Sequence, residues 1–401
     1  MTTEPISRRI GSVAATLGPT LRFFSTSTWA RRQGDPGIAD FAFGNPHEMP
    51  LPAFADALAR WSVPQSKDWF AYTMSEPASQ ALVARTLRER YEIPFEDNDI
   101  FMTNGAFAAI AAALAAIIDP GDQVIFISPP WFFYEALIVA AGAQAVRVGA
   151  DPLTFDLDLH AIAAAITDRT RAIIVNSPNN PTGRIYPPET LKQLATVLST
   201  GSERNNRTIY LLSDEAYSRI IFDGRRYDSP TAFYPYALLL YTYGKTLLTP
   251  GQRMGYIALP PSMPDREQLR QALFLAQVIT GYAFPNALLQ HALPDLESLS
   301  IDIAHLQRKR DHLTAALGNM GYKVNLPEGT FYLLAHSPMA DDQAFAEILA
   351  EQNVFVLPGT VVELPGYFRI SLTANDEMIE RALPGFQAAL ERANAVAPTS
   401  A

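Results

Sequence analysis

The stretch Ala172-Ile173-Ile174-Val175-Asn176-Ser177-Pro178-Asn179-Asn180-Pro181-Thr182-Gly183 decides the fold, because a short apolar run ends there in a turn rich in Pro, Asn and Gly. β-Branched residues favour a strand, and a continuous apolar run is typical of a strand that is covered on both faces. Pro, Asn and Gly are turn formers. The stretch therefore predicts a buried strand that is followed at once by a polar turn.

The same pattern recurs on both sides of this stretch, between residues 98 and 260. Further short apolar runs predict strands at Gln123 to Ser128, Ala145 to Val148, Thr208 to Ser213, Ala237 to Thr242 and Gly255 to Leu259. Helical patterns lie between them and begin near Ala106, Phe132, Leu159, Pro188 and Arg266. Strands that alternate with helices predict an α/β fold with a mainly parallel sheet between helices.

After about residue 285 the rhythm changes. A long helical stretch is expected from Asn286 to Leu317, and short strands are expected at Tyr322 to Leu326, Thr330 to Ala335, near Val354 and near Phe368. Helices are expected from Asp342 to Gln352 and at the end, to about Asn394. This pattern predicts a smaller α+β domain. We expect an N-terminal segment (1–45) that packs with the small domain, a large domain (46–285) and the small C-terminal domain (286–401).

Length and composition limit the classes of protein. The chain has 401 residues, of which 48% are hydrophobic and 18% charged, as in a well-buried globular protein of about two domains. The net charge of −10 disfavours nucleic acid as the main partner. The absence of cysteine excludes disulfides and thiolate nucleophiles. No apolar run approaches the ~20 residues of a membrane helix. We expect no membrane partner, and the composition is compatible with the cytoplasm.

Residues of chemical interest follow the predicted strands, where sites form in open α/β sheets. Lys245 follows the strand that ends at Thr242, and a lysine in a pocket can lose its proton and attack an aldehyde, although a lone lysine is more often a surface charge. Asp214 follows another strand, where it can cap a helix or pair with a protonated ring nitrogen. Tyr217 lies about one helical turn further and can reach the same ligand.

Four more features have both a structural and a functional interpretation. The turn at Asn180 can simply reverse the chain or present its amide to a ligand. The helix start at Gly105-Ala106-Phe107 offers free N–H groups that suit a phosphate. Trp131 belongs to the core or covers a planar ring. Arg369 lies in an apolar strand and needs either an internal salt bridge or a substrate carboxylate. Walker, G-x-G-x-x-G and H-E-x-x-H motifs are absent, so nucleotide and metal sites lack support.

Together and in this order, these residues resemble the aminotransferases of class I/II, which are fold-type I pyridoxal-phosphate (PLP) enzymes of the aspartate-aminotransferase-like superfamily. The resemblance extends from Gly44-Asn45-Pro46 to the strand of Arg369, and its most specific parts are residues 180–183, residues 214–217 and Lys245 with Arg253. It implies a large PLP-binding domain with a seven-stranded sheet. It also implies ping-pong transfer of an amino group from an L-amino acid to a 2-oxo acid, through pyridoxamine phosphate, and a homodimer with its site at the subunit interface.

The resemblance implies a role for each matching residue around the PLP ring. Lys245 resembles the lysine that holds PLP as a Schiff base, and Asp214 resembles the partner of the pyridinium nitrogen. Asn180 and Tyr217 resemble the donors to the phenolic oxygen, and Trp131 resembles the aromatic that stacks on the ring. These residues would keep the pyridine ring protonated and make it an electron sink.

The resemblance also implies a phosphate site and a substrate site. The phosphate site comprises Gly105, Ala106, Phe107, Thr242, Arg253 and, from the neighbouring subunit, Tyr72. The substrate site comprises Arg369 as the carboxylate clamp, together with Asn180, Trp131 and Gly44. Three positions depart from the usual family pattern: Gly244 where serine is common, Phe107 where a small polar residue is common, and the Glu76-Pro77 pair after Tyr72.

Other PLP reactions share the same set of residues. A C–S lyase, a decarboxylase and an amino-acid oxidase remain alternatives, and so does a PLP-binding protein that has lost catalysis. The substrate pocket is expected to include aromatic residues, namely Phe23, Phe24, Trp29, Tyr282 or Phe284, which suit an apolar or aromatic substrate or else form interface core.

Overall fold

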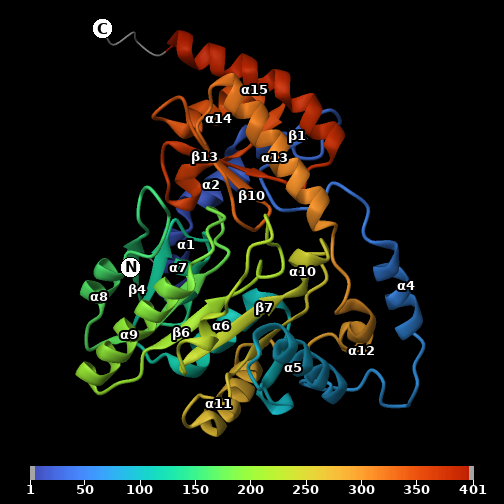
Figure 1. Cartoon of the computed structure of the whole chain (residues 1–401), viewed down its shortest axis with the longest axis vertical. Helices are drawn as coiled ribbons and strands as arrows, with labels where there is room; N and C mark the ends of the chain where they lie inside the picture. The colour runs from blue at the N-terminus through green and yellow to red at the C-terminus, as the bar shows by residue number, and fades with distance from the viewer. Residues whose placement is uncertain (1–4, 397–401) are drawn as a thin grey trace.

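The computed structural model describes residues 5–396, and its centre is a seven-stranded sheet (Figure 1). Its strand order is β2-β8-β7-β6-β5-β3-β4. These strands are, in chain order, β2 (Ile100–Thr103), β3 (Gln123–Ser128), β4 (Gln144–Gly149), β5 (Thr170–Asn176), β6 (Tyr210–Asp214), β7 (Ala237–Thr242) and β8 (Gly255–Ala258). β8 alone runs opposite to the other six strands, so its pairs with β2 and β7 are antiparallel. The predicted mainly parallel sheet is confirmed, and β2 is a strand that the sequence did not predict.

Helices cover both faces of the sheet because successive strand residues face opposite ways. On one face, Val124 and Phe126 pack with α6 (Gly105–Ile117), α7 (Tyr134–Ala140) and α11 (Arg266–Ile279). On the other face, Ile125 and Ile127 pack with α8 (Leu159–Ala165) and α9 (Pro188–Asn205). The β2 end of that second face is covered by α5 (Pro77–Tyr91) and α12 (Ala287–Leu296), beside α4 (Pro52–Trp61). Burial on both faces explains the continuous apolar strands.

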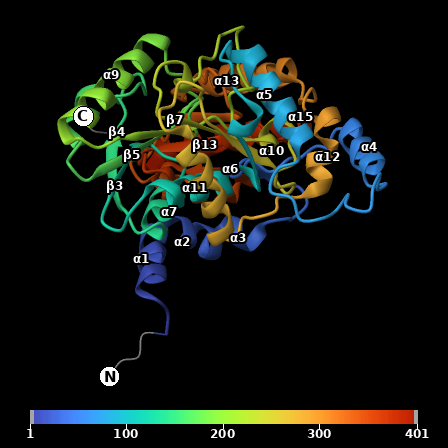
Figure 2. The ribbon, with the colours of Figure 1, turned by 90° about the horizontal axis from the view of Figure 1, so that it is seen from below.

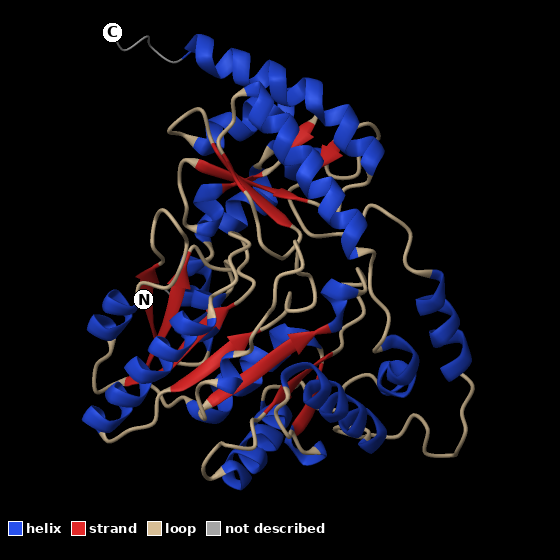
Figure 3. Cartoon of the chain, in the orientation of Figure 1, coloured by secondary structure: helices blue, strands red, loops and turns tan. Residues whose placement is uncertain are grey.

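The small domain is a four-stranded sheet in the order β12-β13-β10-β9, with helices above it (Figures 1 and 3). Its elements are β9 (Val324–Asn325), β10 (Tyr332–His336), β12 (Leu357–Pro358), β13 (Tyr367–Ser371), α13 (Ile303–Met320), α14 (Asp342–Glu351) and α15 (Asp376–Val396). The prediction of one helix from Asn286 to Leu317 is wrong. Asp302 starts a new helix, α13, because its side chain caps the His305 N–H at 2.9 Å.

The N-terminal segment contacts both domains. It contains α1 (Arg8–Thr16), α2 (Gly18–Thr26), α3 (Thr28–Arg32) and β1 (Ala39–Asp40). β1 pairs in parallel with β11 (Val354–Phe355) of the small domain, whereas α1 packs against α7 of the large domain (Figure 2). Within residues 5–396, no helix combines the length and the apolar character needed to cross a membrane.

Candidate active site

The segments that follow five strands of the large sheet, β2, β3, β5, β6 and β7, meet at its carboxyl end around one cavity of about 150 Å³. Most of the residues that the sequence singled out share this cavity, although they come from segments far apart in the chain. The lining residues are Ala106, Phe107, Trp131, Asn176, Asn180, Asp214, Ala216, Tyr217, Thr242, Gly244, Lys245, Pro250 and Arg253. The fold thus brings together side chains of an acid, two bases and several amide and hydroxyl donors.

Asp214 ends β6 and is held by a neighbour that the sequence did not single out. The Tyr134 hydroxyl donates to Asp214 Oδ2 at 2.5 Å, and the Ala216 N–H donates to Oδ1 at 3.2 Å. Burial raises the pKa of Asp214, while the bonds from Tyr134 and Ala216 and the charge of Lys245 act to lower it. A buried carboxylate of this kind is stabilised by a cation, such as a protonated ring nitrogen.

Asn176 organises the turn that carries Asn180. Its Nδ2 donates to the Asp214 carbonyl at 2.9 Å, and its Oδ1 accepts from the Asn180 N–H at 2.7 Å. The turn after β5 is therefore tied to the end of β6, the neighbouring strand. The sequence did not indicate this role of Asn176, because Asp214, to which its Nδ2 donates, lies 38 residues further along the chain.

Lys245 lies in a short helix, α10 (Tyr243–Thr246), directly after β7. Its Nζ is 5.5 Å from the ring centre of Tyr217 and 5.4 Å from that of Phe331. No carboxylate within residues 5–396 forms an ion pair with it. A lysine between aromatic rings and without an acid partner is placed to react as an amine with a carbonyl.

The start of α6 lies beside Arg253 and Thr242. Gly105 has a φ of +82°, and a Cβ on it would lie 2.7 Å from Arg253 Nη2 and 3.4 Å from Thr242 Oγ1. Burial lowers the pKa of Arg253, whose Nη1 donates only to the Pro250 carbonyl, at 2.6 Å, among the described residues. Free helix N–H groups beside an uncompensated cation favour a phosphate.

Close packing explains why glycine, rather than serine, occupies position 244. A Cβ there would lie 3.1 Å from Pro250 Cα, so the chain after Lys245 packs directly against Gly244. A serine would require this turn to shift by a few tenths of an ångström.

Arg369 on β13 is only 1% exposed and lines a second cavity, of about 360 Å³, that adjoins the first. Nη1 donates to Asn180 Oδ1 and Nη2 donates to the Ala42 carbonyl, both at 2.9 Å, while buried Nε has no partner. The internal salt bridge considered for Arg369 does not occur in the described part of the chain, and burial lowers the pKa of its guanidinium. A buried guanidinium with free donors is suited to an incoming carboxylate.

Tyr332 is a second residue that the sequence did not single out. Its ring centre is 3.9 Å from Arg369 Cζ, and a Cβ on Gly44 would lie 2.5 Å from its hydroxyl, so only glycine leaves room for this tyrosine. Burial acts to raise the pKa of Tyr332, but Arg369, Lys245 and Tyr217 outweigh it and lower the pKa. Burial and the interaction with Tyr332 raise the pKa of Tyr217.

The second cavity, of about 360 Å³, adjoins the first and shares four residues with it. Those shared residues are Trp131, Asn180, Lys245 and Pro250. The rest of its lining is Phe24, Trp29, Gln33, Phe43, Gly44, Asn45, Phe132, Tyr332 and Arg369. Of the five aromatic residues expected in the substrate pocket, Phe24 and Trp29 line this cavity, whereas Phe23, Tyr282 and Phe284 do not.

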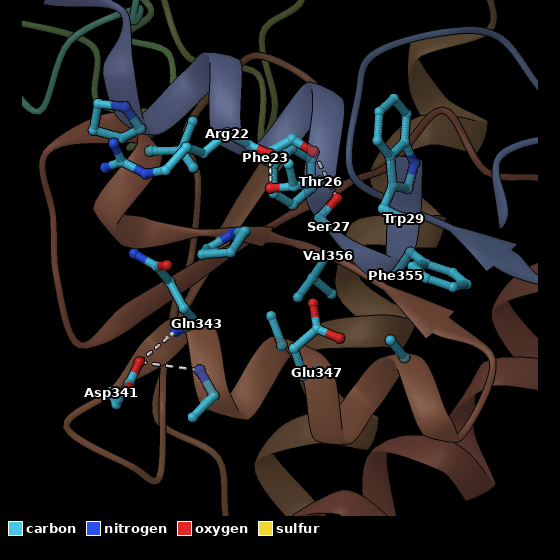
Figure 4. Close-up of a pocket in the computed structure, with 16 residues that line it drawn as sticks. Arg22, Phe23, Thr26, Ser27, Trp29, Asp341, Gln343, Glu347, Phe355 and Val356 are labelled. Atoms are coloured by element: carbon cyan, nitrogen blue, oxygen red, sulfur yellow. Dashed lines mark hydrogen bonds between the residues drawn. The ribbon is translucent and has the colours of Figure 1, made fainter. Parts of the chain in front are cut away.

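A third cavity, of about 350 Å³, lies between α2–α3 and α14 and also includes Trp29 (Figure 4). Two acids line it, Asp341 and Glu347, and Glu347 accepts from the Thr28 hydroxyl at 2.5 Å. No residue expected to hold the cofactor lines it. Phe23 and Trp29 pack between this cavity and the second one, with ring centres 5.4 Å apart.

Tyr72 lies outside both site cavities of its own chain. Its side chain is 87% exposed and packs against Phe284 with ring centres 4.9 Å apart. The structure therefore does not join Tyr72 to the phosphate site of the same chain.

Known proteins resemble this chain over nearly its whole length. The family model "Aminotransferase class I and II" matches residues 36–386. The aspartate/prephenate aminotransferase of Thermus thermophilus is 31% identical over 372 residues, which cover 90% of this chain and 93% of that protein. An aspartate aminotransferase of Thermotoga maritima is 29% identical, covering 75% of this chain and 78% of that protein.

Solved structures agree with the sequence comparison. An aminotransferase from Eubacterium rectale superposes with a TM-score of 0.86 at 29% identity, covering 97% of each chain. The Thermus thermophilus aspartate aminotransferase with maleate gives 0.82 at 28% identity, covering 97% of this chain and 100% of that one. The fold, the residues at the carboxyl end of the sheet and these likenesses lead to one conclusion: the chain belongs to the class I and II aminotransferase family and is an aminotransferase.

Proposed function

We propose that the chain binds PLP through Lys245 and transfers the amino group of an L-amino acid to a 2-oxo acid. The observation that carries the proposal is the content of the 150 Å³ cavity: Lys245, an amine with no ion-pair partner within residues 5–396, shares it with the buried acid Asp214 and the cation Arg253. PLP offers an aldehyde, a basic ring nitrogen and a phosphate, which match these groups in turn. When bound, PLP supplies an electron sink for charge that develops at the substrate Cα.

Asp214 would keep the ring nitrogen protonated. The Tyr134 hydroxyl and the Ala216 N–H hold its two oxygens, so the carboxylate is fixed before the cofactor arrives. An anion that is already oriented requires little reorganisation when charge develops in the ring. Tyr134 is a positioning residue for Asp214 in this proposal.

Asn180 and Tyr217 would donate to the phenolic oxygen of the cofactor. Asn180 Oδ1 already accepts from Arg369, which leaves its Nδ2 as the free donor. Trp131 would cover the ring, since its indole is held edge-on by Phe107, with ring centres 4.8 Å apart, and by Tyr134, at 5.4 Å.

Lys245 and Arg369 would act on the substrate. With PLP bound, Lys245 Nζ would serve as the base that accepts the proton from the substrate Cα. Arg369 would hold the α-carboxylate. Asn180 would couple Arg369 to the cofactor, because it accepts a hydrogen bond from Arg369 and also lines the cofactor cavity. Glycine at position 44 would let Tyr332 pack beneath the clamp.

We also propose a homodimer in which Tyr72 of one protomer reaches the phosphate site of the other. The support is a set of exposed apolar side chains around Tyr72 and along α11, which a second copy would bury. They are Phe70, Tyr72, Phe274, Leu275, Val278, Ile279 and Phe284. We further propose the division into segments 1–45, 46–285 and 286–401. Two apolar clusters that lie wholly within 46–285 and a third that lies mostly within 286–401 support it.

The test is a visible absorption spectrum of the purified protein before and after addition of single amino acids without any oxo acid. An amino acid that converts the band of the lysine-bound cofactor stoichiometrically to that of pyridoxamine phosphate, with release of its 2-oxo acid, supports transamination. Catalytic appearance of ammonia, carbon dioxide or peroxide with the band retained would instead support elimination, decarboxylation or oxidation. Absence of any such band after reconstitution with PLP would refute the proposal.

A further inference from the structure

The cavity beside Arg369 has an aromatic wall that the transfer reaction does not require. Phe24 and Phe43 stack with ring centres 4.7 Å apart and an interplanar angle of 13°, and Trp29 meets Phe43 edge to face at 4.8 Å. Phe132 approaches Phe24 at 6.4 Å from the large-domain side. The wall thus joins the N-terminal segment to the loop after β3.

Packing behind the wall holds its rings in place. Trp29 is buried, and its indole N–H donates to Asp40 Oδ2 at 3.0 Å. Phe23 stacks on the far side of Trp29, with ring centres 5.4 Å apart. Phe24, in contrast, stays partly exposed, which is the expected state of a ring that a ligand would cover.

The charges around the cavity match an α-amino acid but not a second acid group. Among the residues that line it, Arg369 and Lys245 are the charged side chains, and the proposed function already uses both. Three arginines lie close to the cavity in the chain but do not line it, and Arg22 lines the third cavity instead. Arg31 donates to the Thr26 carbonyl at 2.6 Å, and Arg32 pairs with Asp35 at 3.1 Å. A side-chain carboxylate would be desolvated against aromatic rings without a counter-ion, which is costly.

The size of the cavity suits one amino acid. Its 360 Å³ lies near the lower end of the ~300–1,000 Å³ range of small-molecule sites. The side chain of an aromatic amino acid would contact Phe24, Phe43 and Trp29, while the α-carboxylate of the same amino acid would reach Arg369.

We propose that this pocket selects L-amino acids with aromatic or other large apolar side chains over dicarboxylic ones. The inference rests on the proposed function, since it assumes that Arg369 holds the α-carboxylate and that Lys245 marks the reacting carbon. It gives this chain a substrate class that differs from the aspartate in the names of the relatives.

Equilibrium binding to the PLP-loaded protein tests the inference without turnover. 3-Phenylpropanoate and succinate both carry the carboxylate that Arg369 would hold, and they differ in the group that enters the aromatic pocket. Isothermal titration should show 3-phenylpropanoate binding at least about 30-fold more tightly, because succinate leaves its second carboxylate unpaired. Equal or tighter binding of succinate would overturn the inference and would mean that a cation from outside this lining, such as one of the partner subunit, completes the pocket.

A matched pair of variants tests the wall itself. Phe24→Ala removes a partly exposed wall ring, whereas Leu21→Ala truncates an exposed side chain of the same helix that does not line the cavity. We expect Phe24→Ala to lower kcat/KM for L-phenylalanine about tenfold with little change for L-alanine, as loss of an aromatic contact implies. Leu21→Ala should change neither. Equal losses for both substrates in Phe24→Ala would refute selection by the wall.

The two proposals fail in different ways. If the protein forms no lysine-bound PLP band, the proposed function is wrong. If the band forms and amino acids react, but aspartate and glutamate are preferred over phenylalanine, tyrosine and leucine in kcat/KM, the function stands and the substrate class is wrong.

Discussion

Replacement of Arg369 by methionine separates its role on the substrate from its role in the fold. A guanidinium has five N–H donors, and the described residues accept from two of them, through Asn180 and Ala42. Three donors remain for a carboxylate. Hydrogen bonds to charged groups contribute about 1.5–3 kcal/mol each, so a two-point clamp is worth about 3–6 kcal/mol. We therefore expect Arg369→Met to lower kcat/KM for an amino acid by about 10²–10⁴-fold.

The stability of the same variant should change little. Methionine removes the two bonds to Asn180 and Ala42, but it also removes a buried cation that no acid compensates within residues 5–396. Replacement of a buried charge by an apolar residue of similar length is often neutral. Chemical denaturation should give a free energy of unfolding within about 1.5 kcal/mol of wild type.

The assay compares an amino acid with an amine that lacks the carboxylate. Steady-state rates with L-phenylalanine should fall steeply in Arg369→Met, while the slow reaction of 2-phenylethylamine should not fall. Arg369→Lys keeps the charge but loses the fork geometry, so its kcat/KM should lie between those of wild type and Arg369→Met. Equal losses with both substrates, or no loss with either, would refute the assignment of Arg369 to the carboxylate.

Three further predictions follow from neighbouring contacts. Tyr134→Phe removes the 2.5 Å bond to Asp214 and should lower kcat about tenfold while the pKa of Asp214 rises, as a pH profile of kcat would show; an unchanged profile would contradict this positioning role. Gly105→Ala places a Cβ 2.7 Å from Arg253 Nη2 at a φ of +82° and should weaken PLP binding at least about tenfold in equilibrium dialysis. Burial raises the pKa of Glu215 from 4.5 to about 7, so the native state keeps this proton longer than the unfolded state and stability falls as the pH rises from 4.5 to 7. The expected loss in the free energy of unfolding is about 3 kcal/mol, and Glu215→Gln should abolish it. The free energies of unfolding of the two proteins, measured by denaturation between pH 4.5 and 7, should therefore diverge as the pH rises. An equal pH dependence in both proteins would contradict this prediction.

The sequence predicted the parts of the fold that depend on local patterns. Strands β3 and β5 appear as apolar runs because both of their faces are buried. Strand β2 escaped prediction; it lies at the edge of the sheet and pairs only with β8. The break between α12 and α13 escaped as well, although the Asp302 cap is local, because residues 297–302 contain no Gly or Pro that would interrupt the helical pattern.

The candidate site was predictable where a residue follows a strand and unpredictable where two distant segments meet. Lys245 and Asp214 follow strands whose ends must converge in a parallel sheet. Tyr134 reaches Asp214 across 80 residues, and Tyr332 packs on Arg369 from the adjacent strand. A tyrosine in an apolar sequence gives no sign of which residue its hydroxyl will contact in the fold. The sequence likewise could not show that Arg369 has no acid partner within residues 5–396, because that depends on where the fold places every acidic side chain.

The central claim is that Lys245 carries the cofactor, and borohydride reduction followed by peptide mass spectrometry tests it most directly. Reduction fixes PLP on whichever lysine holds it, and the chain offers Lys67, Lys192, Lys309 and Lys323 as internal controls. We predict a pyridoxyl-phosphate mass on the peptide of Lys245 alone, at one per chain, and none in Lys245→Ala. A stoichiometric label on another lysine, or no label on a protein reconstituted with PLP, would contradict the account.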